Sequence, residues 1–141
     1  MGATIRCGDI SIDVPYYGYH RLKRKVAEFC PKEIKEHFLK FDYAKYVYWT
    51  EEEEKQYNEK IERLWTENKK YRKIINFLYS PDCDANFSYG TAKDILKIIG
   101  DYNDTTTIYG YAGWGKNAAR FSDFKKVLEE SAFKKKRLSV Y

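Results

Sequence analysis

The sequence has few of the residues on which metal-binding and disulfide-bonded proteins depend. Its 141 residues include three cysteines, Cys7, Cys30 and Cys83, and two histidines, His20 and His37. The cysteines are odd in number and lack Cys-x-x-Cys spacing, so a zinc site would need an unusual ligand set and a disulfide framework is disfavoured. We expect reduced thiols and no cofactor.

Long apolar segments are missing as well. No stretch has the length of a signal-peptide apolar region or of a membrane span. A myristoylation motif is also incomplete, because Arg6 occupies the position where the motif needs Ser or Thr. We expect a soluble cytoplasmic protein, folded as a single domain over residues 1–141.

The usual signatures of catalysis are absent too. Neither His20 nor His37 has a nucleophile or carboxylate partner visible in the sequence. The glycines at 110, 113 and 115 are not spaced like a phosphate-binding loop and follow no clear strand. We therefore expect a binding protein rather than an enzyme.

Aromatic residues are abundant instead. Fourteen Tyr, eight Phe and three Trp make up 18% of the chain, more rings than a domain of this length can bury. Tyrosine suits half-buried sites and interfaces, because its large apolar face ends in a hydroxyl that needs a partner. The net charge of +5 is compatible with an anionic partner but does not require one.

Hydrophobic periodicity predicts an α+β fold. Residues 3–14 alternate around Gly8-Asp9, which is typical of a β-hairpin. The C-terminal residues 138–141 are expected to form a strand that pairs with this hairpin. Between them, apolar residues at helical spacing predict about four to five helices. Residues 41–49 are aromatic and favour a strand or an extended loop, and Ser122 is expected to cap the last helix.

One of the expected helices is long and amphipathic. Thr50 and Glu53 form a capping-box pattern, and four glutamates follow Thr50 where the helix dipole favours negative charge. An apolar stripe then continues to Leu78, so a continuous helix would be roughly 40 Å long. Asn68 is the one polar residue on this stripe.

The segment after this helix resembles a degenerate calcium loop. Asp82 and Asp84 hold ligand positions of such a loop, but Ala85 and Thr91 replace the glycine and the bidentate glutamate that calcium needs. We expect the polar residues to support the turn and Ser88 to cap the next helix. Asp82 and Asp84 are therefore weak metal candidates.

Several short motifs resemble a family of uncharacterised phage and prophage proteins. Those proteins open with Met-Gly-x-x-Ile-Arg, have a tyrosine-containing segment before a basic helix, and carry a Ser-Asp-Cys-Asp-Gly-type loop. The matching positions here are Met1, Gly2, Ile5 and Arg6; Tyr16, Gly18, Tyr19 and Arg21; and Asp82, Cys83, Asp84, Phe87 and Ser88. Pro81 and Ala85 depart from the pattern, which puts a shared metal role in doubt. The resemblance implies action on host machinery or defences inside the host cell, and it supplies no active site.

Two surfaces are candidates for binding. The first is a glycine-rich loop in which aromatic rings lie next to a cation, together with the arginine that follows the loop. Its candidate residues are Tyr109, Tyr111, Trp114, Lys116 and Arg120. This composition suits a small anionic, nucleotide-like ligand or a host-protein interface, and Tyr109 and Trp114 fit a role in closing the core equally well. Arg21 and Arg24 form a second basic surface, and self-association is possible.

The alternative function is nucleic-acid binding through the basic helix from Tyr19 to Phe29. Further basic clusters lie at residues 69–73 and 134–137. Tyrosines beside two of the clusters offer stacking next to phosphate-seeking charges. Lysines in the last turn of a helix also complement its dipole, which explains residues 134–137 without a partner.

Overall fold

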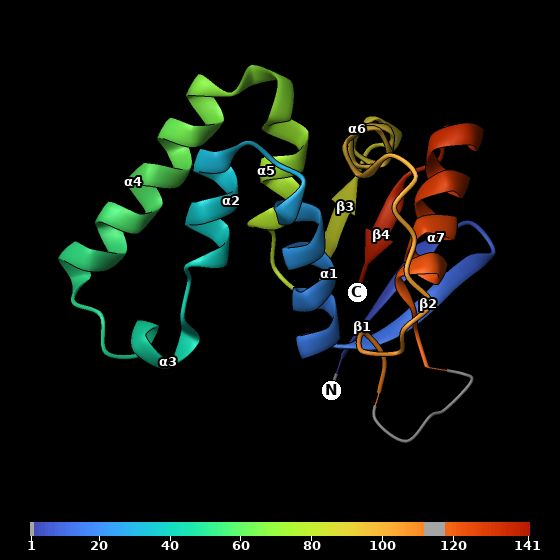
Figure 1. The fold of residues 1–141 in the computed structure, drawn as a ribbon, viewed down its shortest axis with the longest axis horizontal. Helices are drawn as coiled ribbons and strands as arrows, with labels where there is room; N and C mark the ends of the chain where they lie inside the picture. The colour runs from blue at the N-terminus through green and yellow to red at the C-terminus, as the bar shows by residue number, and fades with distance from the viewer. Residues whose placement is uncertain (1, 112–117) are drawn as a thin grey trace.

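The fold is α+β: one antiparallel sheet of four strands with helices packed on one of its faces (Figure 1). The structure, a computed structural model, describes residues 2–111 and 118–141. The strands are β1 (Gly2–Cys7), β2 (Ile10–Pro15), β3 (Ala85–Phe87) and β4 (Leu138–Val140), in the order β2-β1-β4-β3. Both the expected hairpin and the pairing of the C-terminal strand with it are confirmed.

Strand alternation explains the two faces of the sheet. In the hairpin Ile5 pairs with Ile12, and in β4 the residues Leu138 and Val140 are buried while Ser139 is half-buried. One face is therefore apolar and packs on helices, and the opposite face is polar, as successive side chains in a strand point to opposite sides. Gly8 has a φ of +60° in the tight turn of the hairpin, a conformation that suits glycine.

The helices are more numerous than the sequence predicted. Their bounds are α1 (Tyr16–Glu28), α2 (Lys32–Leu39), α3 (Tyr43–Tyr46), α4 (Glu51–Glu67), the 3₁₀ turn η1 (Lys69–Tyr71), α5 (Arg72–Leu78), α6 (Tyr89–Ile99) and α7 (Phe121–Lys134). Among the described residues, none of these helices combines the length and the apolar character that a bilayer span requires.

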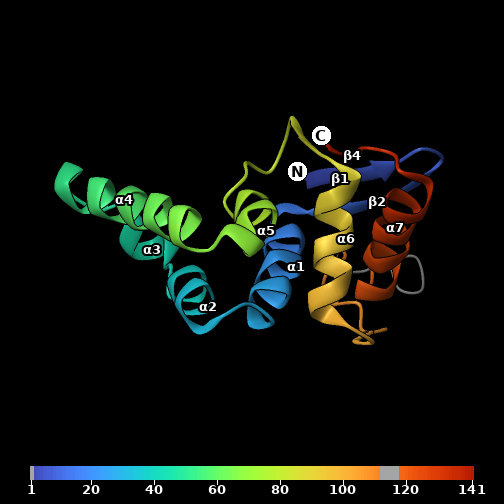
Figure 2. The ribbon, with the colours of Figure 1, turned by 90° about the horizontal axis from the view of Figure 1, so that it is seen from above.

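The predicted long helix is broken, and Asn68 is the reason. The capping box at Thr50 and Glu53 is present. At Asn68 the backbone leaves the helical region, with φ −116° and ψ 65°, and the side-chain amide donates a hydrogen bond to the Leu64 carbonyl at 2.8 Å. The chain then turns through η1 and returns as α5, so α4 and α5 form a hairpin that extends to one side of the molecule (Figures 1 and 2).

Three local expectations were wrong. Residues 41–49 contain the short helix α3, because the Asp42 carboxylate accepts a hydrogen bond from the Ala44 amide and caps a helical turn. α7 begins before Ser122. At this start of the helix the Asp123 carboxylate accepts a hydrogen bond from the Arg120 amide at 3.0 Å. Ser88 holds the cap position of α6 but makes no side-chain capping bond.

The core lies between the sheet and helices α1, α5, α6 and α7. Its largest fully buried side chains include Tyr19, Phe77, Phe121 and Phe124, with ring centroids 5.7–6.3 Å apart in contacting pairs. A second aromatic cluster joins α2, α3, α4 and α5, and its centre is Tyr57, which lies 5.6 Å from Phe41 and 5.2 Å from Trp49. Rings at these distances attract each other beyond their area burial, so this cluster fixes the α4–α5 hairpin to α2.

Candidate functional site

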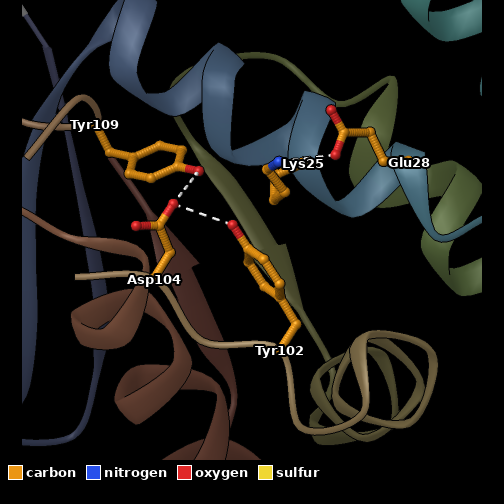
Figure 3. Close-up of polar contacts among 5 residues, drawn as sticks. All are labelled: Lys25, Glu28, Tyr102, Asp104 and Tyr109. Atoms are coloured by element: carbon orange, nitrogen blue, oxygen red, sulfur yellow. Dashed lines mark hydrogen bonds and ion pairs between the residues drawn. The ribbon is translucent and has the colours of Figure 1, made fainter. Parts of the chain in front are cut away.

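Tyr109, predicted to bind a ligand from an exposed loop, is buried at 1% exposure. Its hydroxyl donates to Asp104 Oδ2 at 3.4 Å, and Tyr102 donates to the same oxygen at 3.0 Å (Figure 3). The pKa of Asp104 lies below its usual range, mainly because its carboxylate accepts a hydrogen bond from the Thr106 amide. Burial raises the pKa of Tyr109. Tyr109 therefore anchors the loop to the core, and its ring is not a free stacking surface.

Of the other loop candidates, Tyr111 and Arg120 are among the described residues. Tyr111 is half-buried, and its hydroxyl donates to the Val14 carbonyl at 3.4 Å. Arg120 is half-buried at the start of α7. Trp114 and Lys116 lie outside the described residues, so the loop site as a whole stays a prediction.

The two predicted basic residues on α1 contact backbone of other segments. Arg21 donates to the Ile108 carbonyl at 2.6 Å, and its guanidinium carbon lies 5.2 Å from the Tyr17 ring centre. Arg24 donates to the Leu39 carbonyl at 3.2 Å. Arg21 thus joins α1 to the loop that holds Tyr109, and the two surfaces predicted separately are neighbours.

The aspartate loop does not assemble a metal site. Asp82 Oδ1 lies 3.8 Å from the ammonium of Lys23, and Asp84 is exposed with a φ of +55°. Over residues 2–111 and 118–141, no group of three or more potential metal-ligating side chains occurs.

A cleft not predicted from the sequence opens beside α1. It consists of two adjoining hollows of about 340 Å³ and 850 Å³ that share five lining residues. Its walls come from α1 and α4, from the end of α2 and the segment that follows it, and from the end of α5 and the loop after it. We call it the aromatic cleft, since rings line most of it: Tyr16, Tyr17, His20, Phe38, Phe41, Tyr43, Tyr46, Tyr57 and Tyr79.

A buried lysine lies at the edge of this cleft. Lys23 lines the smaller hollow although it is only 3% exposed. Its ammonium donates to the Ser80 carbonyl at 2.7 Å and lies 4.5 Å from the centre of the Tyr19 ring. Burial lowers the pKa of Lys23 to about 8, and the neighbouring Asp82 opposes that shift. A lysine this buried needs compensation for its lost hydration.

The carboxylate partner of Lys23 is loosely placed. The 3.8 Å separation from Asp82 is longer than a charge-assisted hydrogen bond, which is about 2.8 Å. The Asp82 side chain is 49% exposed on the loop after α5. The pairing of Lys23 with Asp82 is therefore weaker than a direct charge-assisted hydrogen bond.

His20, on the same wall, supplies a neutral polar group. Burial is the main cause that lowers the pKa of His20 below its ordinary value, and the nearby positive charges of Arg24 and Lys23 lower it further. Its imidazole is neutral at pH 7 and offers one donor and one acceptor nitrogen. The cleft thus combines rings for stacking, a buried cation, a half-exposed carboxylate and a neutral imidazole.

Sequence reasoning missed Lys23 because it stands among Arg21, Arg24 and Lys25, in the basic helix that was considered as a nucleic-acid surface. Helical spacing contains the missing signal. Lys23 lies four residues after Tyr19 and four before Ala27, and both of those are fully buried. Residues four apart share one face of a helix, so Lys23 is on the core side of α1.

Comparison of the chain with protein-family models, with curated proteins and with solved structures finds no match in any of the three.

Proposed function

We propose that the protein binds, without catalysis, a small nucleotide-like ligand in the aromatic cleft: a flat ring system that carries an anionic group. The observation that carries the proposal is the buried ammonium of Lys23 at the edge of a ring-lined cleft, paired at 3.8 Å with a half-exposed carboxylate.

The chemistry of the cleft matches such a ligand in two ways. Tyrosine and phenylalanine faces stack on nucleobases with little preference for sequence, at about 1–3 kcal/mol per base. The anionic group replaces Asp82 as the partner of Lys23 and forms a shorter charge-assisted hydrogen bond in surroundings of low dielectric. Both contacts are available at once, because Lys23 and the rings line the same hollow.

The resemblance to phage proteins suggests a biological setting for this binding. We propose a phage or prophage origin, with the ligand sequestered from a host pathway or with a host protein blocked through the same cleft. The alternative, nucleic-acid binding through α1, has less support. The cations on that helix are engaged within the chain: Lys23 is buried, Arg21 and Arg24 bind carbonyls, and Lys25 pairs with Glu28 at 2.8 Å.

Isothermal titration calorimetry with the four ribonucleoside 5′-monophosphates tests the proposal. We expect at least one to bind the wild type, and we expect Lys23→Met to weaken that binding by ten-fold or more. Lys25→Met removes a charge from the same helix outside the cleft and is the matched control, so its affinity should equal that of the wild type.

Choline and arginine methyl ester are included because Asp82 and Glu54 also line the cleft. Aromatic rings with carboxylates bind cations. Binding of these cations in place of the nucleotides, or nucleotide binding that is equal in the wild type and in Lys23→Met, would contradict the proposal.

A further inference from the structure

Helix α4 presents nearly all of its surface to solvent. Of its seventeen residues only Leu64 is buried. The helix carries seven glutamates and three basic side chains, a net charge of −4, although the whole chain has a charge of +5. A helix that is polar on most sides either depends on pairs within itself or faces a partner. One pair within it, Lys55 with Glu59 at 4.0 Å, is long and exposed and contributes little.

An apolar groove lies between α4 and α5. Its volume is about 520 Å³, and Ile61, Trp65, Ile75 and Tyr79 line it together with polar residues that include Glu62 and Asn76. Trp65 is 40% exposed, and the guanidinium of Arg72 lies 4.1 Å from its ring centre.

The acidic face of α4 is continuous with this groove. Glu62 lines the groove and also a neighbouring shallow hollow, where further carboxylates gather: Glu51, Glu54 and Glu59. An apolar slot next to several carboxylates fits an apolar side chain surrounded by cations.

The end of α7 has that composition. Phe133 is 75% exposed, and four basic residues follow it directly along the chain: Lys134, Lys135, Lys136 and Arg137. These four are all exposed, and Lys134 also pairs with Glu130 of α7 at 2.8 Å. Lysines at the end of a helix complement its dipole, but that role does not explain an exposed phenylalanine among them.

The two surfaces cannot meet within one molecule. α4 and α7 lie at opposite ends of the long axis in both views of the ribbon (Figures 1 and 2). We infer that two copies of the chain associate head to tail, with Phe133 of one copy in the α4–α5 groove of the next and its four cations against the glutamates of α4. Such a contact joins two different surfaces, so it propagates to a ring or a chain of copies rather than stopping at a symmetric dimer.

Sedimentation equilibrium of the full chain over a range of protein and salt concentrations tests this inference, with two blocking variants. Phe133→Glu removes the inserted ring and places a negative charge at its position. Asn76→Arg places a cation in the groove at an exposed position on α5. Tyr48→Ser removes an equally exposed aromatic ring that does not line the groove, and it is the control.

The wild type and Tyr48→Ser should show an average mass that rises with protein concentration and falls with added salt. Each blocking variant alone should remain a monomer. An equal mixture of the two should form a dimer, because the first keeps an intact groove and the second keeps an intact Phe133.

Three results would overturn the inference: a wild type that stays monomeric at millimolar concentration and low salt, blocking variants that associate like the wild type, or a mixture that stays monomeric. This test does not depend on ligand binding, so it stands apart from the proposed function.

Discussion

Replacing Lys23 with methionine removes the buried charge and keeps a side chain of similar length on the Tyr19 ring. In the wild type the charged form of Lys23 is disfavoured by burial, which lowers its pKa from 10.5 to about 8. The unfolded chain therefore holds this proton more tightly than the folded chain does. At pH 7 the difference costs about 3 kcal/mol of stability, at 1.36 kcal/mol for each pKa unit.

Methionine removes this cost and introduces a smaller one. The Ser80 carbonyl loses the donor that Lys23 supplies at 2.7 Å, and an unsatisfied buried acceptor costs about 1–2 kcal/mol. Asp82 also loses Lys23 as an ion-pair partner. Because this pair is long and the Asp82 side chain is half-exposed, its removal costs little stability. We expect Lys23→Met to be more stable than the wild type by about 1–2 kcal/mol at pH 7.

The pH dependence gives a sharper test than the single value. As the pH rises through 8 toward 10.5, the folded wild type releases the Lys23 proton before the unfolded chain does, and the cost disappears. Between pH 7 and pH 9.5 the advantage of the variant should fall by about 2 kcal/mol. Urea unfolding followed by circular dichroism measures both proteins at both pH values, with Lys25→Met as the control.

A constant difference between wild type and Lys23→Met from pH 7 to pH 9.5 would refute this reasoning. So would a variant that is less stable than the wild type by more than 1 kcal/mol. Either result would mean that the ammonium of Lys23 is well hydrated or well paired. Burial would then not lower the pKa of the lysine in the cleft.

Three further predictions concern stability and use the same urea assay. Gly18→Ala should destabilise the protein by more than about 2 kcal/mol, because a Cβ there would overlap the Tyr109 carbonyl oxygen; unchanged stability would show that the loop can shift. Asp104→Asn should cost about 1–2 kcal/mol, since the carboxylate accepts the hydrogen bond of Tyr109. Burial lowers the pKa of His37 to about 4 and keeps it neutral, and its Nδ1 shares a hydrogen bond with the Tyr79 hydroxyl. The stability that neutral His37 contributes is therefore fully present above pH 6.5 and should be lost as the pH falls toward 4. His37→Phe should remove this pH dependence of the unfolding free energy.

The hairpin, the C-terminal strand and most helices could be predicted from the sequence because their signals are local, whereas β3 lies in a segment that was predicted as a loop. Alternation in residues 3–14 and the Gly8-Asp9 turn specify the hairpin, and Thr50 with Glu53 marks the start of α4. The break at Asn68 is subtler. One polar residue on an apolar stripe is compatible with a continuous helix, and only the return of α5 against α2 shows that the side chain instead ends the helix at the Leu64 carbonyl.

The aromatic cleft could not be predicted, because its walls come from segments that are distant in the sequence. His20 on α1, Tyr46 on α3 and Asp82 after α5 meet only once the chain has folded. Loops without periodicity give no signal of burial, and for that reason the sequence left open whether Tyr109 binds a ligand or closes the core, where it is found. The burial of Lys23 was not predicted, although its spacing from Tyr19 carries the signal for the core side of α1.

The measurement that tests the central claim most directly is a ¹H–¹⁵N NMR titration of the labelled full chain with the ribonucleoside 5′-monophosphates. We expect saturable shifts in amides of the cleft, at residues 16–23, 41–46 and 80–82, and we expect them to be lost in Lys23→Met. An unchanged spectrum at millimolar nucleotide, or shifts confined to surfaces outside these segments, would contradict the assignment of the aromatic cleft as a nucleotide-type binding site.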